Sequence, residues 1–259
     1  MCRLAAYTGP EIPLENIIVV PRHSLLDQSQ NATEAKLAVN GDGFGISWYG
    51  HGREPGQYRD VLPAWSDGNL TSICRMVRSS LFLAHVRAST NGETSRVNCH
   101  PFSYENWSFM HNGQIHDFNR IRRDLEATLP DDLYCARRGT TDSEMLFLLL
   151  LANGLDTSPV TACETVISMI QSFQGKRDKP NRMACVFSDG QDLYGFRHSC
   201  DRHSPSLYVS GTLDNEGRAI VSEPLDGDVR NWSSIPEDNM ATLSADGLRM
   251  DPLSIAVAA

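Results

Sequence analysis

The order of hydrophobic patterns along the chain is what most limits the folds open to it. Short apolar runs typical of strands fill much of the first and last thirds, and helical patterns from Met145 and over residues 160–173 lie between them. The last third begins with a predicted hairpin, in which residues 183–187 and 193–196 flank an Asp-Gly turn. Since no linker interrupts this order, it predicts a single layered α+β domain over residues 1–259.

Composition narrows the class of protein further. The 259 residues are 41% apolar, enough for a sizeable core, and carry a formal net charge of −9. That charge argues against a nucleic-acid surface, because Asp124 and Glu126 dilute the densest basic patch, residues 120–123. The apolar run 145–152 is too short to cross a bilayer, so we expect no membrane association and a cytoplasmic location.

The cysteines do not form a recognisable framework. There are seven of them, an odd number, and they are widely scattered without a Cys-x-x-Cys pair or a Cys/His ligand spacing. Neither a disulfide scaffold nor a zinc site is therefore expected, and nothing in the chain implies an organic cofactor.

Cys2 stands directly behind the initiator methionine and ahead of the apolar run 4–7. Removal of Met1 would leave Cys2 as the amino terminus, where one residue carries a nucleophilic thiol and an amine that can act as its base. These groups titrate at about 8.5 and about 7.7 to 8.0, so proton exchange near neutral pH needs little perturbation. The alternative role is that of a small buried hydrophobe at the start of a strand.

Arg87 closes a predicted buried strand, residues 80–87, where a loop begins. A cation in that place needs a partner or water, which leaves two interpretations. It is a surface or ion-paired arginine, or it binds a carboxylate, whose two oxygens match the guanidinium fork. The glycines of residues 40–45 resemble a phosphate-binding loop, yet no Lys-Ser/Thr follows, so a tight turn is favoured there.

Two polar segments later in the chain adjoin apolar ones. A short strand over residues 107–110 is expected to stop at the His-Asn-Gly run, residues 111–113. Thr141 and Glu144 fit a capping box at the start of the apolar helix, which would account for that polar run without any function.

Taken in order, four pieces of the chain resemble the class II glutamine amidotransferases, a family of N-terminal-nucleophile hydrolases. They are Cys2, residues 85–92, residues 111–113 and residues 141–144. The likeness is densest over residues 83–113, extends to the glycine turn and to Ser-Glu-Pro-Leu at 222–225, and so covers most of the chain.

The Met-Cys-Arg-Leu start and the compact length are most similar to the stand-alone members, including those acting in ergothioneine biosynthesis and glutathione degradation. The resemblance implies a four-layer αββα sandwich, the N-terminal-nucleophile hydrolase fold, with two antiparallel sheets between helix layers. It implies no metal and no cofactor.

The resemblance also implies the roles of seven residues. Cys2 would be the nucleophile, while the Asn112 side chain and the Gly113 backbone N–H would form the oxyanion hole. Arg87 would bind the α-carboxylate of glutamine and Asp142 its α-ammonium group.

Thr90 would add a hydrogen bond at the carboxylate end, and His111 would lie at the substrate or only brace the turn. His85 and His100 are expected to be structural. The chain departs from the amino-sugar-forming members, because Ala88 and Asn91 stand where those enzymes carry a Trp and a His.

The function that this resemblance implies is hydrolysis of the γ-amide of glutamine or of a γ-glutamyl compound through a Cys2 thioester, with release of glutamate. One alternative is a glutaminase subunit that passes ammonia to a separate synthetase, since no synthase domain follows in this sequence. Another is a non-catalytic binding protein that retains the fold, which an uncleaved Met1 would favour.

Overall fold

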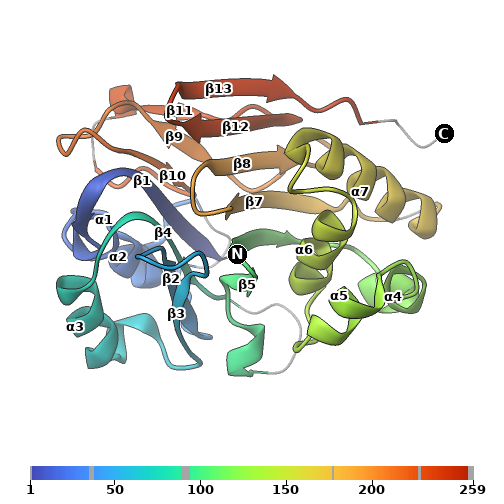
Figure 1. Ribbon diagram of the computed structural model, residues 1–259, viewed down its shortest axis with the longest axis horizontal. Helices are drawn as coiled ribbons and strands as arrows, with labels where there is room; N and C mark the ends of the chain where they lie inside the picture. The colour runs from blue at the N-terminus through green and yellow to red at the C-terminus, as the bar shows by residue number, and fades with distance from the viewer. Residues whose placement is uncertain (1, 35–37, 89–93, 177, 227–228, 256–259) are drawn as a thin grey trace.

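Two antiparallel sheets, stacked face to face, form the centre of the molecule (Figure 1). The structure, a computed structural model, describes residues 2–34, 38–88, 94–176, 178–226 and 229–255. The seven-stranded sheet has the order β11-β9-β10-β1-β4-β2-β3. Its strands are β1 (Arg3–Pro13), β2 (Phe44–Trp48), β3 (Gly56–Asp60), β4 (Arg78–Val86), β9 (Tyr208–Ser210), β10 (Arg218–Val221) and β11 (Trp232–Ser234).

The second sheet has six strands in the order β13-β12-β8-β7-β6-β5. They are β5 (Phe102–Tyr104), β6 (Trp107–Gln114), β7 (Arg182–Ser188), β8 (Leu193–His198), β12 (Asn239–Ser244) and β13 (Gly247–Pro252). The predicted hairpin is confirmed, because β7 pairs antiparallel with β8 and Phe187 lies opposite Tyr194.

Helices cover the outer faces of both sheets. Outside the seven-stranded sheet lie α1 (Glu15–Ile18), α2 (Leu25–Asn31) and α3 (Gly68–Met76). Outside the six-stranded sheet lie α4 (Phe118–Glu126), α5 (Asp131–Ala136), α6 (Asp142–Ala152) and α7 (Pro159–Gln174) (Figure 1). The predicted four-layer αββα sandwich is therefore confirmed. Within the described ranges, no helix has the length and apolar character needed to cross a bilayer.

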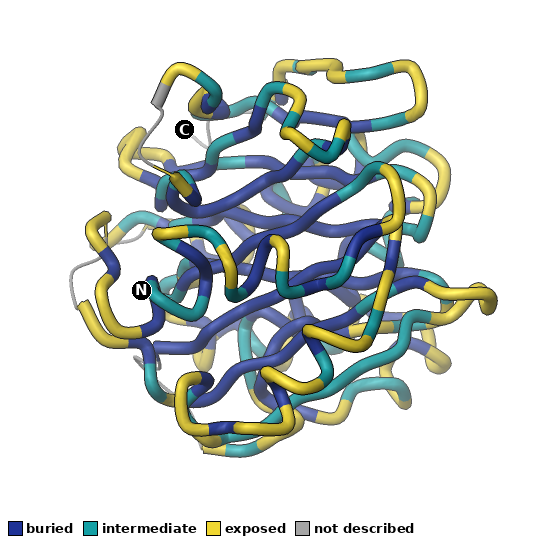
Figure 2. Tube along the Cα trace, turned by 90° about the vertical axis from the view of Figure 1, so that its left-hand side faces the viewer, coloured by how far each residue is buried: buried dark blue, intermediate teal, exposed yellow. Residues whose placement is uncertain are grey.

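Three apolar clusters hold these layers together, one at each helix–sheet boundary and one between the sheets. The buried residues run along the stacked strands, while exposure is concentrated in the connections at the rim (Figure 2). In the cluster between the sheets, Leu4 of β1 and Leu83 of β4 meet Met110 of β6. Because side chains alternate along a strand, residues two positions further on face the same layer.

The structure corrects the expected end of one strand. Rather than stopping before residues 111–113, β6 continues to Gln114, with Asn112 paired to Ala184 and Gly113 to Met183 on β7. The ladder satisfies the backbone of this polar run, so the polar side chains do not end the strand. Asn112 consequently faces the layer between the sheets, while its neighbour His111 faces the helices.

Candidate active site

Cys2 lies just before β1 and is half-buried. Its thiol lies 3.6 Å from the carbonyl oxygen of Ala88, and the Ala88 N–H donates a hydrogen bond to the sulfur at 3.4 Å. Burial raises the pKa of the Cys2 thiol, although the Ala88 N–H and the cations Arg87 and Arg3 act in the opposite direction. A thiol that is protonated at rest needs a base at the moment of attack.

Arg87 follows β4 directly and is 4% exposed. Its N–H donates to the carbonyl oxygen of Gly43 at 2.8 Å, and its own carbonyl accepts from the N–H of Asp42 at 3.0 Å. Gly43 has a φ of +116°, and a Cβ there would lie 2.8 Å from Cys99 Sγ and 2.9 Å from the Asp60 carbonyl. The chain bends at Asp42, and the hydrogen bonds of this glycine-rich segment fix the backbone that carries Arg87.

Asn112 is a fully buried side chain on the inner face of β6. Among the residues that the structure describes, neither its Nδ2 nor its Oδ1 has a hydrogen-bond partner. A buried amide without a partner costs free energy, which a ligand offering complementary groups would offset. The unmet donor and acceptor are therefore available to a polar group of a ligand.

Gly113 cannot be replaced without moving the backbone. Its φ is +153°, and a Cβ on this residue would lie 1.8 Å from the Arg182 carbonyl oxygen and 2.6 Å from His111 Nε2. A glycine here lets two strands and a histidine ring crowd against one peptide unit.

Asp142 opens helix α6 and is held beside the end of β6. Its Oδ2 accepts a hydrogen bond from the N–H of Ile115 at 2.8 Å. The hydroxyl of Thr141 accepts from the N–H of Glu144 at 3.1 Å, so the N-cap is formed as predicted. The Glu144 carboxylate, however, accepts from the N–H groups of Arg138 and Gly139 rather than completing a capping box.

His111 contacts the first turn of α6 and the start of β7. Its Nδ1 lies 2.9 Å from Ser143 Oγ and its Nε2 lies 3.2 Å from the Arg182 carbonyl oxygen. Burial lowers the pKa of His111, against a raising effect of Asp142. These contacts fit the bracing role better than contact with substrate. Thr90 lies outside the described residues.

His85 and His100 are two further buried histidines, and their ring centroids lie 4.3 Å apart. Burial, with a smaller effect of Arg87 and His111, lowers the pKa of His85 to about 3. The pKa of His100 is likewise lowered by burial and by His85, so both rings are neutral near pH 7. In the part of the chain that the structure describes, no three His, Cys, Asp or Glu side chains are grouped as metal ligands.

Glu223 is a charged group near the site for which the sequence suggested no role. It is 1% exposed, and its Oε1 lies 2.8 Å from Arg3 Nη1 and accepts from the Glu34 N–H at 2.9 Å. Its Oε2 lies 2.7 Å from His23 Nε2 and accepts two hydrogen bonds from Thr33. Burial alone would raise the pKa of Glu223, but these donors outweigh it and hold the pKa at about 2.

This carboxylate is connected to the thiol residue. The Arg3 guanidinium, itself fully buried, donates from Nε to the carbonyl oxygen of Cys2 at 2.6 Å. The Ser-Glu-Pro-Leu run at 222–225 was visible only as part of the family likeness. Its partners lie more than 180 residues away along the chain, so no local pattern could reveal them.

Replacing Glu223 with Gln is expected to lower the free energy of unfolding at pH 7 by about 3 to 5 kcal/mol, because Arg3 is left buried without its counter-charge. The folded pKa of about 2 lies below the ordinary 4.5, so the contribution is present above pH 4.5 and is lost as the pH falls toward 2. Urea unfolding at several pH values should show wild type and variant converging over that window.

The matched control is Glu11→Gln, which removes an exposed partner of Arg78 and should cost no more than about 1 kcal/mol. Equal effects of the two variants at pH 7 would contradict the importance of the buried network.

Comparisons with known proteins agree with this geometry. The chain matches the family model of the class II glutamine amidotransferases over residues 23–246, well over half of its length. The chain belongs to the class II glutamine amidotransferases. The predicted resemblance is thereby confirmed, and with it the expectation of an enzyme.

Two curated relatives of this amidotransferase cover almost all of it. It is 29% identical to the probable glutamine amidotransferase DUG3 of Saccharomyces cerevisiae, over 98% of this chain and 84% of that protein. It is 27% identical to the gamma-glutamyl-hercynylcysteine sulfoxide hydrolase of Mycolicibacterium smegmatis, over 98% of this chain and all of that protein.

Solved structures give the same assignment. A glutamine aminotransferase class-II domain protein from Silicibacter pomeroyi superposes with a TM-score of 0.78 at 37% identity, covering 98% of this chain and 100% of that one. The glutamine phosphoribosylpyrophosphate amidotransferase of B. subtilis, at 14% identity and a TM-score of 0.69, shares the fold over half of its own chain.

Proposed function

We propose that this amidotransferase hydrolyses the γ-amide of glutamine or of a γ-glutamyl compound through a thioester on Cys2, releasing glutamate. The observation that carries the proposal is the fully buried Asn112, whose side-chain amide has no partner among the described residues and faces the layer between the sheets beside Gly113. Both curated relatives carry names of γ-glutamyl or glutamine amide chemistry, which supports the same reaction class.

The chemistry begins with removal of Met1, which frees the amine of Cys2. This amine accepts the proton of the thiol, and the sulfur attacks the γ-carbonyl carbon of the substrate. The tetrahedral oxyanion accepts hydrogen bonds from Asn112 Nδ2 and the Gly113 N–H. Collapse of this tetrahedral intermediate breaks the C–N bond, and the protonated amine or ammonia departs. Water then attacks the thioester to give glutamate and the free thiol.

Recognition of the substrate is assigned to groups of opposite charge. The Arg87 guanidinium binds the α-carboxylate, with Thr90 adding a hydrogen bond, and Asp142 binds the α-ammonium group. Asp142 is suited to this because the Ile115 N–H fixes one of its oxygens beside the strand end that carries Gly113. His111 holds this end in place.

The identity of the leaving group separates two versions of this function. In the favoured one the chain acts alone on a γ-glutamyl compound, as the name of the mycobacterial hydrolase suggests. In the other it is a glutaminase subunit that delivers ammonia to a separate synthetase, and stimulation of glutamine hydrolysis by a co-purifying protein would identify it.

Two further properties belong to this proposal. We place the whole chain, residues 1–259, in one catalytic domain. Strands from the first and the last parts of the chain contribute side chains to the same apolar cluster between the two sheets. We also place the protein in the cytoplasm, since all seven cysteines are free thiols, as in a reducing compartment.

The test is Asn112→Ala, which removes a donor to the oxyanion. We expect kcat to fall by about 10² to 10³-fold while KM changes little, because the ground-state carbonyl needs this donor less than the transition state does. Glutamate release from glutamine and from γ-glutamyl peptides gives both constants. Asn31→Ala, at the exposed end of α2, is the matched control. An unchanged kcat in Asn112→Ala would count against the oxyanion role.

A further inference from the structure

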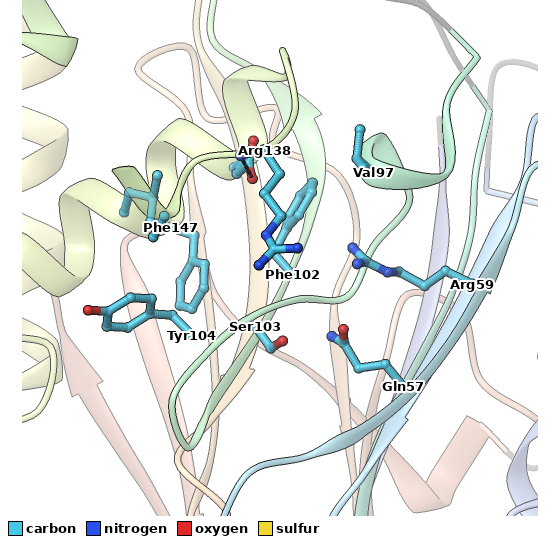
Figure 3. Close-up of a pocket in the computed structure, with 11 residues that line it drawn as sticks. Gln57, Arg59, Val97, Phe102, Ser103, Tyr104, Arg138 and Phe147 are labelled. Carbon is cyan, nitrogen blue, oxygen red and sulfur yellow. Dashed lines mark hydrogen bonds between the residues drawn. The ribbon is translucent and has the colours of Figure 1, made fainter. Parts of the chain in front are cut away.

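A small cavity opens at one edge of the sandwich, and Cys2 is not among its lining residues. It has a volume of about 240 Å³ and lies between edge strands β3 and β5 and the segment that leads from α5 into α6. Of the described residues, none that is assigned to the amide chemistry lines it. Figure 3 shows the side chains of Arg59 and Arg138 extending into this cavity from opposite walls.

The two guanidinium groups lie close enough to affect each other. Burial lowers the pKa of Arg59, Cys99 and Glu144 act in the opposite direction, and the charge of Arg138 adds a smaller lowering effect. Arg59 donates from Nη1 to the Cys99 carbonyl oxygen at 3.1 Å. For Arg138, no hydrogen bond or ion pair connects its guanidinium to any residue in the described ranges. Two like charges facing one cavity repel each other, and an anion bound between them would reduce that repulsion.

The Glu144 carboxylate acts on the charge of Arg59, but its hydrogen bonds go to other groups. Glu144 lines the same cavity, but its Oε1 accepts from the Arg138 backbone N–H at 2.9 Å and its Oε2 from the Gly139 N–H at 2.7 Å. Both carboxylate oxygens therefore serve the backbone at the start of α6. Neither guanidinium group forms an ion pair with a carboxylate of the described residues.

The remaining walls suit the rest of a small organic molecule. Gln57 and Ser103 add polar groups to the lining, and Phe102 and Phe147 add aromatic rings (Figure 3). We propose that this cavity binds a small organic anion, whose carboxylate or phosphate oxygens accept from Arg59 and Arg138 and whose apolar part packs on the two phenylalanines.

The experiment titrates the full chain with inorganic phosphate and, separately, with propionate, using calorimetry at constant ionic strength. Saturable binding is expected, and the relative affinity of the two probes distinguishes a phosphate site from a carboxylate site. Arg138→Gln should weaken binding about tenfold or more, because one charge-assisted contact is lost. Arg75→Gln, an exposed arginine on α3, should leave it unchanged.

Because Arg87 is also proposed to bind a carboxylate, the titrations are repeated in the Arg87→Ala variant. Binding that persists there and is weakened by Arg138→Gln belongs to this cavity, whatever the outcome for the amide chemistry. Absence of saturable binding by both probes, or binding that Arg138→Gln leaves unchanged, would overturn the proposal. Thermal melting of Arg138→Gln verifies its folding, which we expect because the residue is exposed.

Discussion

Replacing Cys2 with Ala is expected to reduce the turnover of glutamine and of γ-glutamyl compounds by at least about 10⁴-fold, the scale seen when a covalent nucleophile is removed. The thiol is the only protein group in the proposed reaction that forms a bond to carbon. Donors to the oxyanion would still be in place, so weak residual catalysis over water is compatible with the account. Steady-state glutamate release measures the effect.

The fold should survive this change. Cys2 precedes β1 and is half-buried, so losing one sulfur atom should alter the melting temperature little. Cys200→Ala, at an exposed cysteine, is the matched control and should retain full activity. Substantial turnover in a correctly folded Cys2→Ala variant would remove Cys2 from its role as nucleophile.

Replacing Arg87 with Ala should raise the KM for glutamine by about 10- to 200-fold, because a charge-assisted contact of about 1.5 to 3 kcal/mol is lost and the substrate carboxylate is left unpaired. Arg87→Lys keeps the charge without the two-pronged geometry and should give an intermediate KM. The backbone of Arg87 is bonded to Gly43 and Asp42 whatever the side chain, so the loop should keep its course.

A substrate lacking the α-carboxylate turns this into a double-mutant cycle. Wild type should prefer glutamine over its decarboxylated analogue, and Arg87→Ala should lose that preference because the same contact is absent in both cases. If the variant still discriminates between the two substrates as wild type does, another group binds the carboxylate and the assignment to Arg87 is wrong.

Much of the fold was predictable because its signals are local. The Asp-Gly turn predicted the β7–β8 hairpin, and a short, nearly continuous apolar run predicted β4, whose end carries Arg87. The end of β6 was misplaced because His-Asn-Gly is typical of a turn. The ring nitrogens of His111 contact Ser143 and Arg182, which are distant in the sequence. The sequence alone therefore does not show that a polar strand end can form its hydrogen bonds here.

The candidate site likewise has a part that the sequence predicts and a part that depends on long-range contacts. Its expected chemistry came from the resemblance of the ordered motifs to the amidotransferase family, and each motif provides a charge or donor that amide hydrolysis needs. The group around Glu223 could not, since Arg3 and Thr33 reach it from a distant part of the chain. The meeting of Arg59 with Arg138 likewise depends on how the edge strands and α5 pack together.

The most direct test of the central claim is the intact mass of the purified protein before and after treatment with diazo-oxo-norleucine, an electrophilic glutamine analogue. The account predicts a mass that lacks Met1 and a single adduct that maps to Cys2 and is blocked by glutamine. A protein that retains Met1 and gains no adduct, or gains one on another cysteine, would contradict it.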